Sequence, residues 1–166
     1  REELLYAGGQ CPSRILHKTT LNKEGDPIAM QITIQIDGGA YPLLGKEILS
    51  RMSIGATGVY MCKNVKVEAI LISTNSPPKD SVYDLGLSQA FFATETHFSR
   101  IAEVLQIDPT DWKSRNILKK GNAFITGGAL AQDSPETALI EQVAKKSDFR
   151  RKHAAYEMLK KRRSDI

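Results

Sequence analysis

The sequence predicts an α+β fold in a single domain. Three observations support this: strand-like alternation of apolar residues comes first, helical spacing comes later, and 166 residues are enough to bury a core. We expect a strand-rich part over residues 1–75, loop and helices over 76–146, and a basic helix over 147–166. An antiparallel hairpin and further strands would then pack with about four to five helices.

The first two strands form the predicted hairpin. Residues 14–20 are a short mixed run, and residues 22–27 bring together Asn, Gly, Asp and Pro, a dense turn signal. Residues 28–36 alternate apolar residues with small or polar ones, which is typical of a strand buried on one face. The side chains expected to point inward are Ile28, Met30, Ile32, Ile34 and Ile36.

A helix and a further strand follow the hairpin. Apolar residues recur at helical spacing over residues 43–53, which predicts a helix there. Residues 65–73 alternate again and predict a strand. The paired prolines within residues 74–80 cannot continue a central strand, so this segment is predicted to be a loop.

A long helix is predicted from Ser88, as its N-cap, to about Gln106. The residues expected on its inward face are Phe91, Glu95, Phe98, Ala102 and Leu105. One carboxylate would therefore lie on an apolar face. Asp108 and Pro109 then begin another helix as N-cap and first helical residue, and this helix is expected to end near residues 119–121.

The C-terminal part is predicted to hold a loop and two helices. Residues 121–133 are the loop, and the segment 134–136 begins the first helix. Ser147 begins the second helix. Its expected inward residues are Phe149, His153, Tyr156 and Leu159.

The positive charge of the chain is concentrated in its last segment. The formal net charge is +4, and residues 145–166 hold nine basic against three acidic side chains. A solvated helix explains this excess, because cations are favoured near helix C-termini. A nucleic-acid-binding module is the alternative. The sequence has little aromatic interleaving and no nucleic-acid-binding motif, so we expect no nucleic-acid partner.

The sequence also bears on location and completeness. No apolar run approaches the roughly 18 residues of a membrane helix, and no signal peptide is visible. We therefore expect a cytoplasmic protein without a membrane partner. The chain begins at Arg1 and stops at Ile166 just after a charged helix. We expect it to be an excised piece of a longer protein.

Residues that could carry chemistry are scattered along the chain. Cys11 and Cys62 are too few for a disulfide framework, a zinc site or an iron–sulfur cluster. The three histidines lie far apart in sequence, and phosphate-binding and nucleophile motifs are missing. We expect no metal site within the chain. Glu95 has two interpretations: a general base, or a carboxylate that fixes nearby backbone N–H groups.

The order of short motifs downstream of residue 60 resembles a known family. The motifs are Tyr60-x-x-x-Asn64-Val65, Thr74-Asn75, Ser76-Pro77-Pro78, Gly86 with Gln89, Phe92-Ala93-x-Glu95, Arg100-Ile101-Ala102, Asp108-Pro109 and Arg115-Asn116. Upstream matches are Gly25, Ile28-Ala29 and Gly39-Ala40-Tyr41. This ordered set is similar to the molybdopterin-binding subunit of the xanthine dehydrogenase and aldehyde oxidase family, the molybdenum hydroxylases.

The resemblance implies an internal fragment of a molybdenum-cofactor-binding domain. The family hydroxylates a purine, another N-heterocycle or an aldehyde with oxygen from water at a molybdenum–molybdopterin centre. Electrons pass through iron–sulfur clusters to FAD on partner domains or subunits. The rest of the molybdopterin subunit, with the general base beyond Ile166, is a further implied partner, and a homodimer is compatible with the resemblance. The fragment alone is expected to be inactive and to bind no metal.

The resemblance also implies site residues. Arg51 matches the arginine that orients substrate in xanthine-type members, and a plain surface arginine is the alternative. The loop written A-F-R-G-F-G-x-P-Q in active members corresponds to residues 81–89. The residues implied at the cofactor are Ser81, Tyr83 and Gln89, and Leu85 is implied in the substrate pocket.

Departures from the family pattern in this loop leave a second hypothesis open. Tyr83 replaces the arginine, Asp84 replaces a glycine, and Leu85 replaces a phenylalanine that stacks on aromatic substrates. Substrate identity and catalysis are therefore both in question. The alternative function is that of a degenerate homologue, which keeps the fold and acts as a non-catalytic scaffold or accessory subunit.

Overall fold

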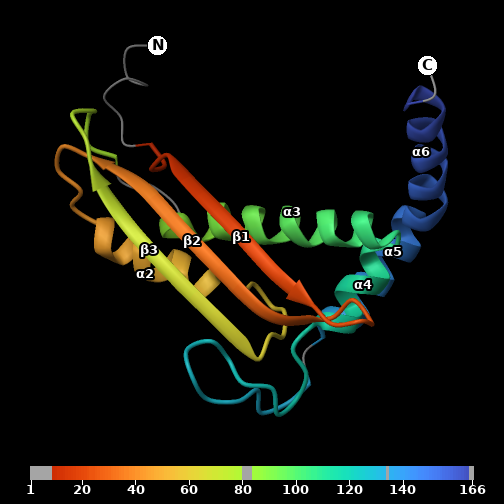
Figure 1. Ribbon diagram of the computed structural model, residues 1–166. Coiled ribbons are helices and arrows are strands. Elements are labelled where there is room, and N and C mark those ends of the chain that lie inside the picture. The colour runs from red at the N-terminus through yellow and green to blue at the C-terminus, as the bar shows by residue number, and fades with distance from the viewer. Residues whose placement is uncertain (1–8, 80–83, 134, 165–166) are drawn as a thin grey trace.

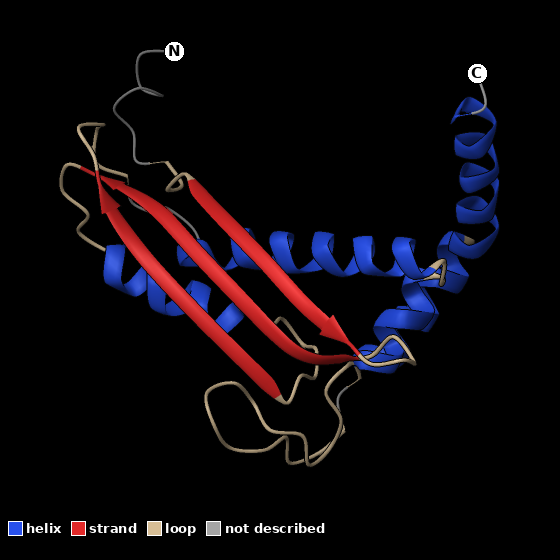
Figure 2. Ribbon diagram, in the orientation of Figure 1, coloured by secondary structure: helices blue, strands red, loops and turns tan. Residues whose placement is uncertain are grey.

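The computed structural model describes residues 9–79, 84–133 and 135–164. A three-stranded sheet is covered on one face by two helices, and further helices extend from the end of the longer one (Figures 1 and 2). The predicted α+β class is confirmed. None of the helices in these ranges is long and apolar enough to cross a membrane.

The sheet has the order β1-β2-β3. Strands β1 (Ser13–Leu21) and β2 (Pro27–Gly39) form the predicted antiparallel hairpin. Strand β3 (Asn64–Ser73) lies parallel to β2, because helix α2 (Gly45–Gly55) provides the crossover between them. The carboxyl ends of β2 and β3 therefore meet at one edge of the sheet, a pairing that the sequence pattern did not predict.

Four of the five expected inward residues of β2 form the centre of the core. Met30, Ile32, Ile34 and Ile36 are buried against the helices. The prediction for Ile28 is wrong, because its side chain is 44% exposed. The pairing register shifts between Thr20 and Leu21, so that Ile28 lies opposite neither of them and falls outside the regular alternation.

Helix α3 (Leu87–Leu105) is rotated relative to the predicted orientation. Its buried residues are Ala90, Thr94, Phe98 and Ala102. Phe91 is 45% exposed and Glu95 lies at the edge of the covered face, so these two predictions are wrong, whereas Leu105 is partly buried and packs against the core as predicted. Ala90 faces the core because its small side chain fits close to α2. Thr94 also faces the core, because its hydroxyl bonds to the carbonyl oxygens of Ala56 (2.8 Å) and Ala90 (2.9 Å).

Helix α4 (Pro109–Asn116) begins as predicted. The Asp108 carboxylate accepts the Thr110 backbone N–H at 2.7 Å, and Pro109 is the first helical residue. The predicted end near residues 119–121 is wrong. Ile117 is extended and forms a bridge with Tyr60, so the chain leaves the helix to pair with the segment that follows α2.

The last two helices are α5 (Glu136–Ser147) and α6 (Phe149–Ser164). Asp148, in a left-handed conformation, separates them, so α6 begins two residues later than predicted from Ser147. Figure 1 shows α6 projecting away from the sheet. Tyr156 is 69% exposed and Leu159 is 53% exposed, so their predicted inward positions are wrong, because no element of the described chain packs against that side of the helix. Phe149 and His153 are partly buried and stack at 5.3 Å.

We predict that Thr94→Val destabilises the fold. Valine keeps the volume but removes the donor to the buried Ala56 and Ala90 carbonyls, which should lower the free energy of unfolding by about 1–2 kcal/mol. Urea denaturation measures this change. Thr96→Val, at an exposed position of the same helix, is the matched control and should have a much smaller effect. Equal effects of the two substitutions would contradict the assigned role of the hydroxyl.

Candidate functional site

The segment before α3 forms a left-handed turn, η1 (Asp84–Gly86). The φ angles of Asp84, Leu85 and Gly86 are 45°, 51° and 88°. This conformation costs a non-glycine residue about 1–2 kcal/mol, so the turn persists because its surroundings hold it. Gly86 packs against α2, where an added Cβ would lie 2.6 Å from Met52 Cγ. Such strained backbone is often found at functional sites.

The Asp84 carboxylate caps α3. One oxygen accepts the Gly86 N–H at 3.2 Å and the other accepts the Ser88 N–H at 3.0 Å. The predicted N-cap role of Ser88 is therefore wrong, because Gly86 is the N-cap residue and the Asp84 carboxylate accepts the Ser88 N–H of the first turn. The turn brings the Asp84 carboxylate back over these donors.

Gln89 joins the head of α3 to the chain segment before β1. Its side-chain Nε2 donates to the Cys11 carbonyl oxygen at 2.6 Å, and the Cys11 thiol donates to the Lys79 carbonyl oxygen at 3.0 Å. Gln89 Oε1 is buried and has no hydrogen-bond partner among the described residues. An orphaned acceptor of this kind is costly and is typical of a site that a further donor completes.

The other predicted site residues are distributed as follows. Ser81 and Tyr83 lie outside the described residues. Leu85 is partly buried, and its side chain packs against the hydrophobic core. Arg51 is exposed on α2 and forms an ion pair with Glu47 at 2.7 Å. The next residue of α2, Met52, contacts Gly86. Arg51 therefore lies on the helix that supports the turn.

The carboxyl end of β2 adds a polar cluster near these loops. The Asp37 carboxylate accepts hydrogen bonds from Thr74 Oγ1 (2.7 Å), the Gly39 N–H (2.9 Å) and Ser76 Oγ (3.3 Å). These bonds, with Thr74 contributing most, lower the pKa of Asp37 below its usual value. The cluster ties the loop after β3 to the end of β2. Sequence reasoning missed it, because its members come from two strand ends that only the parallel pairing unites.

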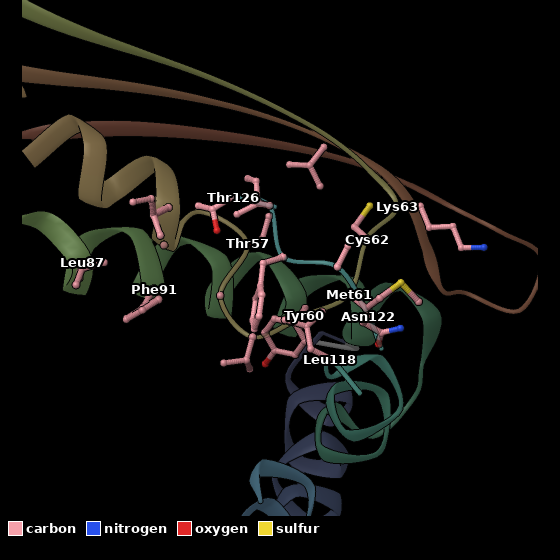
Figure 3. Close-up of a pocket in the computed structure, with 18 of the residues that line it drawn as sticks. Thr57, Tyr60, Met61, Cys62, Lys63, Leu87, Phe91, Leu118, Asn122 and Thr126 are labelled. Carbon is pink, nitrogen blue, oxygen red and sulfur yellow. The ribbon is translucent and has the colours of Figure 1, made fainter. Parts of the chain in front are cut away.

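A cleft lies beside the first turns of α3 (Figure 3). Its volume is about 690 Å³, and its walls are residues 54–55, 57–63 and 65, Leu87 and Phe91 of α3, and residues 118 and 121–126. Lys63 is its one charged residue among the described lining residues. Burial raises the pKa of the Cys62 thiol, which therefore stays protonated and weakly nucleophilic. The cleft suits an apolar or aromatic group rather than thiolate chemistry.

Glu95 has side-chain partners that neither interpretation anticipated. Tyr60 Oη donates to its two oxygens at 2.8 and 3.0 Å, and Lys113 Nζ donates at 2.7 Å. The Lys113 side chain is 18% exposed and the Glu95 side chain 45%. Burial, followed by the neighbouring carboxylate, raises the pKa of Tyr60 above its usual range. The expected bonds from backbone N–H groups are not what holds this carboxylate; a phenol and an ammonium hold it, and they link α3 to α4.

Two histidines that are distant in sequence meet on the sheet. The rings of His17 (β1) and His97 (α3) stack with their centroids 5.0 Å apart, and His97 Nε2 lies 2.8 Å from Thr19 Oγ1. Both ring nitrogens of His17 are buried, and neither has a hydrogen-bond partner in the part of the chain that the structure describes. Burial, with a smaller contribution from His97, lowers the pKa of His17 to about 4. The pair is therefore neutral at pH 7, and its rings pack between β1 and α3.

The comparisons with known proteins identify the family. Residues 1–117 match the family model of the molybdopterin cofactor-binding domain. The chain belongs to this family. The match includes the hairpin, the crossover, the left-handed turn and helices α3 and α4 of this molybdopterin cofactor-binding domain. The resemblance seen in the sequence motifs is thereby confirmed.

Curated relatives of this molybdopterin cofactor-binding domain are much longer proteins. A probable xanthine dehydrogenase component from Bacillus subtilis (strain 168) is 34% identical over 120 residues, which are 72% of this chain and 16% of that protein. The nicotinate dehydrogenase large molybdopterin subunit of Eubacterium barkeri is 30% identical over 146 residues, 87% of this chain and 34% of that protein. The chain thus spans between a sixth and a third of the length of these relatives.

Solved structures share the fold. The aldehyde oxidoreductase of Desulfovibrio gigas superposes with a TM-score of 0.81 at 23% identity, over 87% of this chain and 16% of that one. The CO dehydrogenase of Oligotropha carboxidovorans gives 0.78 at 15% identity, over 96% of this chain and 21% of that one. At these identities the likeness concerns the fold alone.

The described loop fits a neutral part of the molybdopterin better than a phosphate. No group within the described ranges donates to Gln89 Oε1, and the N–H groups of a pterin could do so. Residues 84–89 contain no cation, and Asp84 already occupies the N–H groups of Gly86 and Ser88. Nowhere in the described ranges do three or more His, Cys, Asp or Glu side chains gather to hold a metal ion themselves.

We predict that His17 makes the fold sensitive to mild acid. Well above pH 6.5 His17 is neutral in both states. As the pH falls through 6.5 towards 4, His17 takes up a proton in the unfolded chain but stays neutral in the folded one. The free energy of unfolding should fall over this window and level off below it. Urea denaturation between pH 7.5 and 4 measures the slope.

The matched variants for this prediction are His17→Leu and His153→Leu. His17→Leu should flatten the slope between pH 6.5 and 4, whereas His153→Leu on α6 should leave it in place. An unchanged slope in His17→Leu would show that other groups cause the acid sensitivity.

Proposed function

We propose that this molybdopterin cofactor-binding domain is part of a molybdenum hydroxylase, which oxidises an aldehyde or an N-heterocycle, purines included, with oxygen from water. The observation that carries the proposal is the family match over residues 1–117. The names of the relatives, which include nicotinate dehydrogenase and aldehyde oxidoreductase, support this substrate range. We further propose iron–sulfur and FAD domains or subunits, and the rest of the molybdopterin subunit, as partners.

The surface of the described chain supports its proposed place within a longer subunit. Large apolar side chains are highly exposed at Leu43 (83%), Phe92 (74%) and Val104 (70%). Exposed apolar side chains such as these can be buried by contact with other protein. The relatives are three to six times longer than the matched region, so the proposed remainder of the subunit is large enough to cover them.

The proposed cofactor contacts lie at the head of α3. Gln89 would accept a hydrogen bond from the pterin through its orphaned Oε1, and we propose Ser81 and Tyr83 as its neighbours at the cofactor. The bound group would supply the oxygen-transfer and redox chemistry, and the chain would bind and orient it. The general base is proposed to lie on the rest of the subunit, beyond Ile166.

The proposed substrate contacts are Arg51 and Leu85. A guanidinium can clamp a carbonyl of an N-heterocycle and stabilise developing negative charge. Arg51 is exposed, and its surface pair with Glu47 is worth at most about 1 kcal/mol, so substrate can displace that partner at little cost. Leu85 would line the pocket with an aliphatic side chain, which provides apolar contact without aromatic stacking.

A second candidate function is a non-catalytic homologue that acts as a scaffold or accessory subunit. Two observations favour it: the Asp84 carboxylate occupies the head of α3, and Leu85 packs against the core. The fold would then be retained, while the loop would no longer bind substrate.

Molybdenum content and turnover of the full-length protein decide between the two functions. Protein purified from molybdenum-replete cells should contain molybdenum and pterin, and should oxidise xanthine or an aldehyde with an artificial electron acceptor. The 166-residue chain alone should contain no molybdenum and show no turnover. Full-length protein without molybdenum and pterin would exclude the hydroxylase, whereas molybdenum with no turnover of any purine, N-heterocycle or aldehyde would favour the scaffold.

We predict that Gly86→Ala disrupts the loop and its cofactor contacts. The new Cβ would lie 2.6 Å from Met52 Cγ, and φ is 88°. Gly128→Ala is the matched control, because its φ of 79° imposes the same backbone strain while no atom lies within 4 Å of the new Cβ. Gly86→Ala should destabilise the chain by about 1–3 kcal/mol more than Gly128→Ala. In the full-length protein it should also lower the molybdenum content, whereas Gly128→Ala should not.

A further inference from the structure

The left-handed turn before α3 holds a carboxylate in a position that a bound anion often occupies. Backbone N–H groups at a helix N-terminus attract anions, because they lack partners within the helix and carry the positive end of its dipole. In this chain the two oxygens of Asp84 accept the N–H groups of Gly86 and Ser88, at 3.2 and 3.0 Å. A carboxylate of the chain itself, that of Asp84, therefore occupies this position.

The conformation of the turn keeps the carboxylate there. Asp84 and Leu85 both have positive φ, which is unfavourable for residues with a Cβ. Gly86 is wedged against Met52 and Ile48 of α2, and Leu85 packs against the core. Because α2 and the core hold the two residues that follow it, and because its oxygens bond to the Gly86 and Ser88 N–H groups, the Asp84 carboxylate is retained at this position.

No described cation neutralises Asp84. The segment 84–89 contains no basic residue, Arg51 on α2 is engaged with Glu47, and no ion pair joins Asp84 to the described chain. A second negative charge brought to this end of α3 would find the Gly86 and Ser88 N–H groups taken and would meet like-charge repulsion.

We infer that Asp84 is a specificity-determining residue, which closes the head of α3 to anionic groups and favours neutral substrates. This inference rests on the proposed function, which places the loop beside the substrate. It follows that the enzyme discriminates between rings that differ only in the charge of one substituent. Its relative from Eubacterium barkeri is named for nicotinate, an anion, so the two proteins would differ in this respect.

The first test measures anion binding to the 166-residue chain. Sodium sulfate is titrated while the backbone amide signals of Gly86 and Ser88 are followed by NMR. Asp84→Gly tolerates the positive φ and exposes both donors, so it should bind sulfate about tenfold more tightly than the unsubstituted chain. Asp84→Asn removes the charge but keeps a capping oxygen, and should fall between the two. Glu141→Gln, an exposed site on α5 with the same charge change, is the control and should behave like the unsubstituted chain.

The second test measures selectivity in the full-length protein. The ratio of kcat/KM for pyridine-3-carboxamide to that for pyridine-3-carboxylate should favour the neutral amide by about tenfold or more. In Asp84→Asn this ratio should shrink, mainly through a lower KM for the carboxylate. Glu141→Gln should leave the ratio as it is.

The two tests separate this inference from the proposed function. If the unsubstituted chain binds sulfate as tightly as Asp84→Gly does, the claim that Asp84 closes the head of α3 to anions is overturned. An unchanged substrate ratio in Asp84→Asn would overturn its role in specificity. If the full-length protein turns over neither ring, the proposed function fails, and the sulfate titration still decides whether Asp84 closes the helix.

Discussion

The packing of Phe98 between Tyr60 and Trp112 is the contact on which the rest of the structure depends. All three side chains are buried, with ring centroids 4.5 Å apart for Tyr60–Phe98 and 5.2 Å apart for Phe98–Trp112. They come from the segment after α2, from α3 and from α4, so one aromatic cluster joins three elements to the sheet. Trp112 Nε1 also donates to the Gly25 carbonyl oxygen at 2.9 Å, which ties α4 to the hairpin turn.

This cluster fixes the position of α3, and that position determines which elements each end of the helix meets. At its start, α3 meets the end of α2 and the loops at the carboxyl ends of β2 and β3, where Asp37, Asp84 and Gln89 gather their partners. The clustering follows a general rule, since the carboxyl ends of parallel strands are the usual place for ligands in sheets with a crossover. The βαβ unit thus matters more to the candidate site than the hairpin that dominates the sequence pattern.

Local chemistry made several features predictable. The alternation over residues 28–36 predicted β2, and the Asp108-Pro109 pair predicted the start of α4, because a strand period and an N-cap depend on neighbours in the chain. For the candidate site, the motif order singled out the segment 81–89 and its family. The sequence could not show that Asp84 caps α3 in place of Ser88, because that depends on a left-handed turn stabilised by α2.

By itself, then, the sequence determined the strands, most of the helices and the family, since these follow from the spacing of apolar residues and from the order of short motifs. Only the tertiary structure decided the parallel pairing of β2 with β3, the rotation of α3 and the partners of Glu95. Each of these depends on contacts between residues far apart in the chain: Glu95 meets Tyr60, and His97 meets His17. Spacing records which side chains share a face of one element, but the packing of one element on another decides which face is buried.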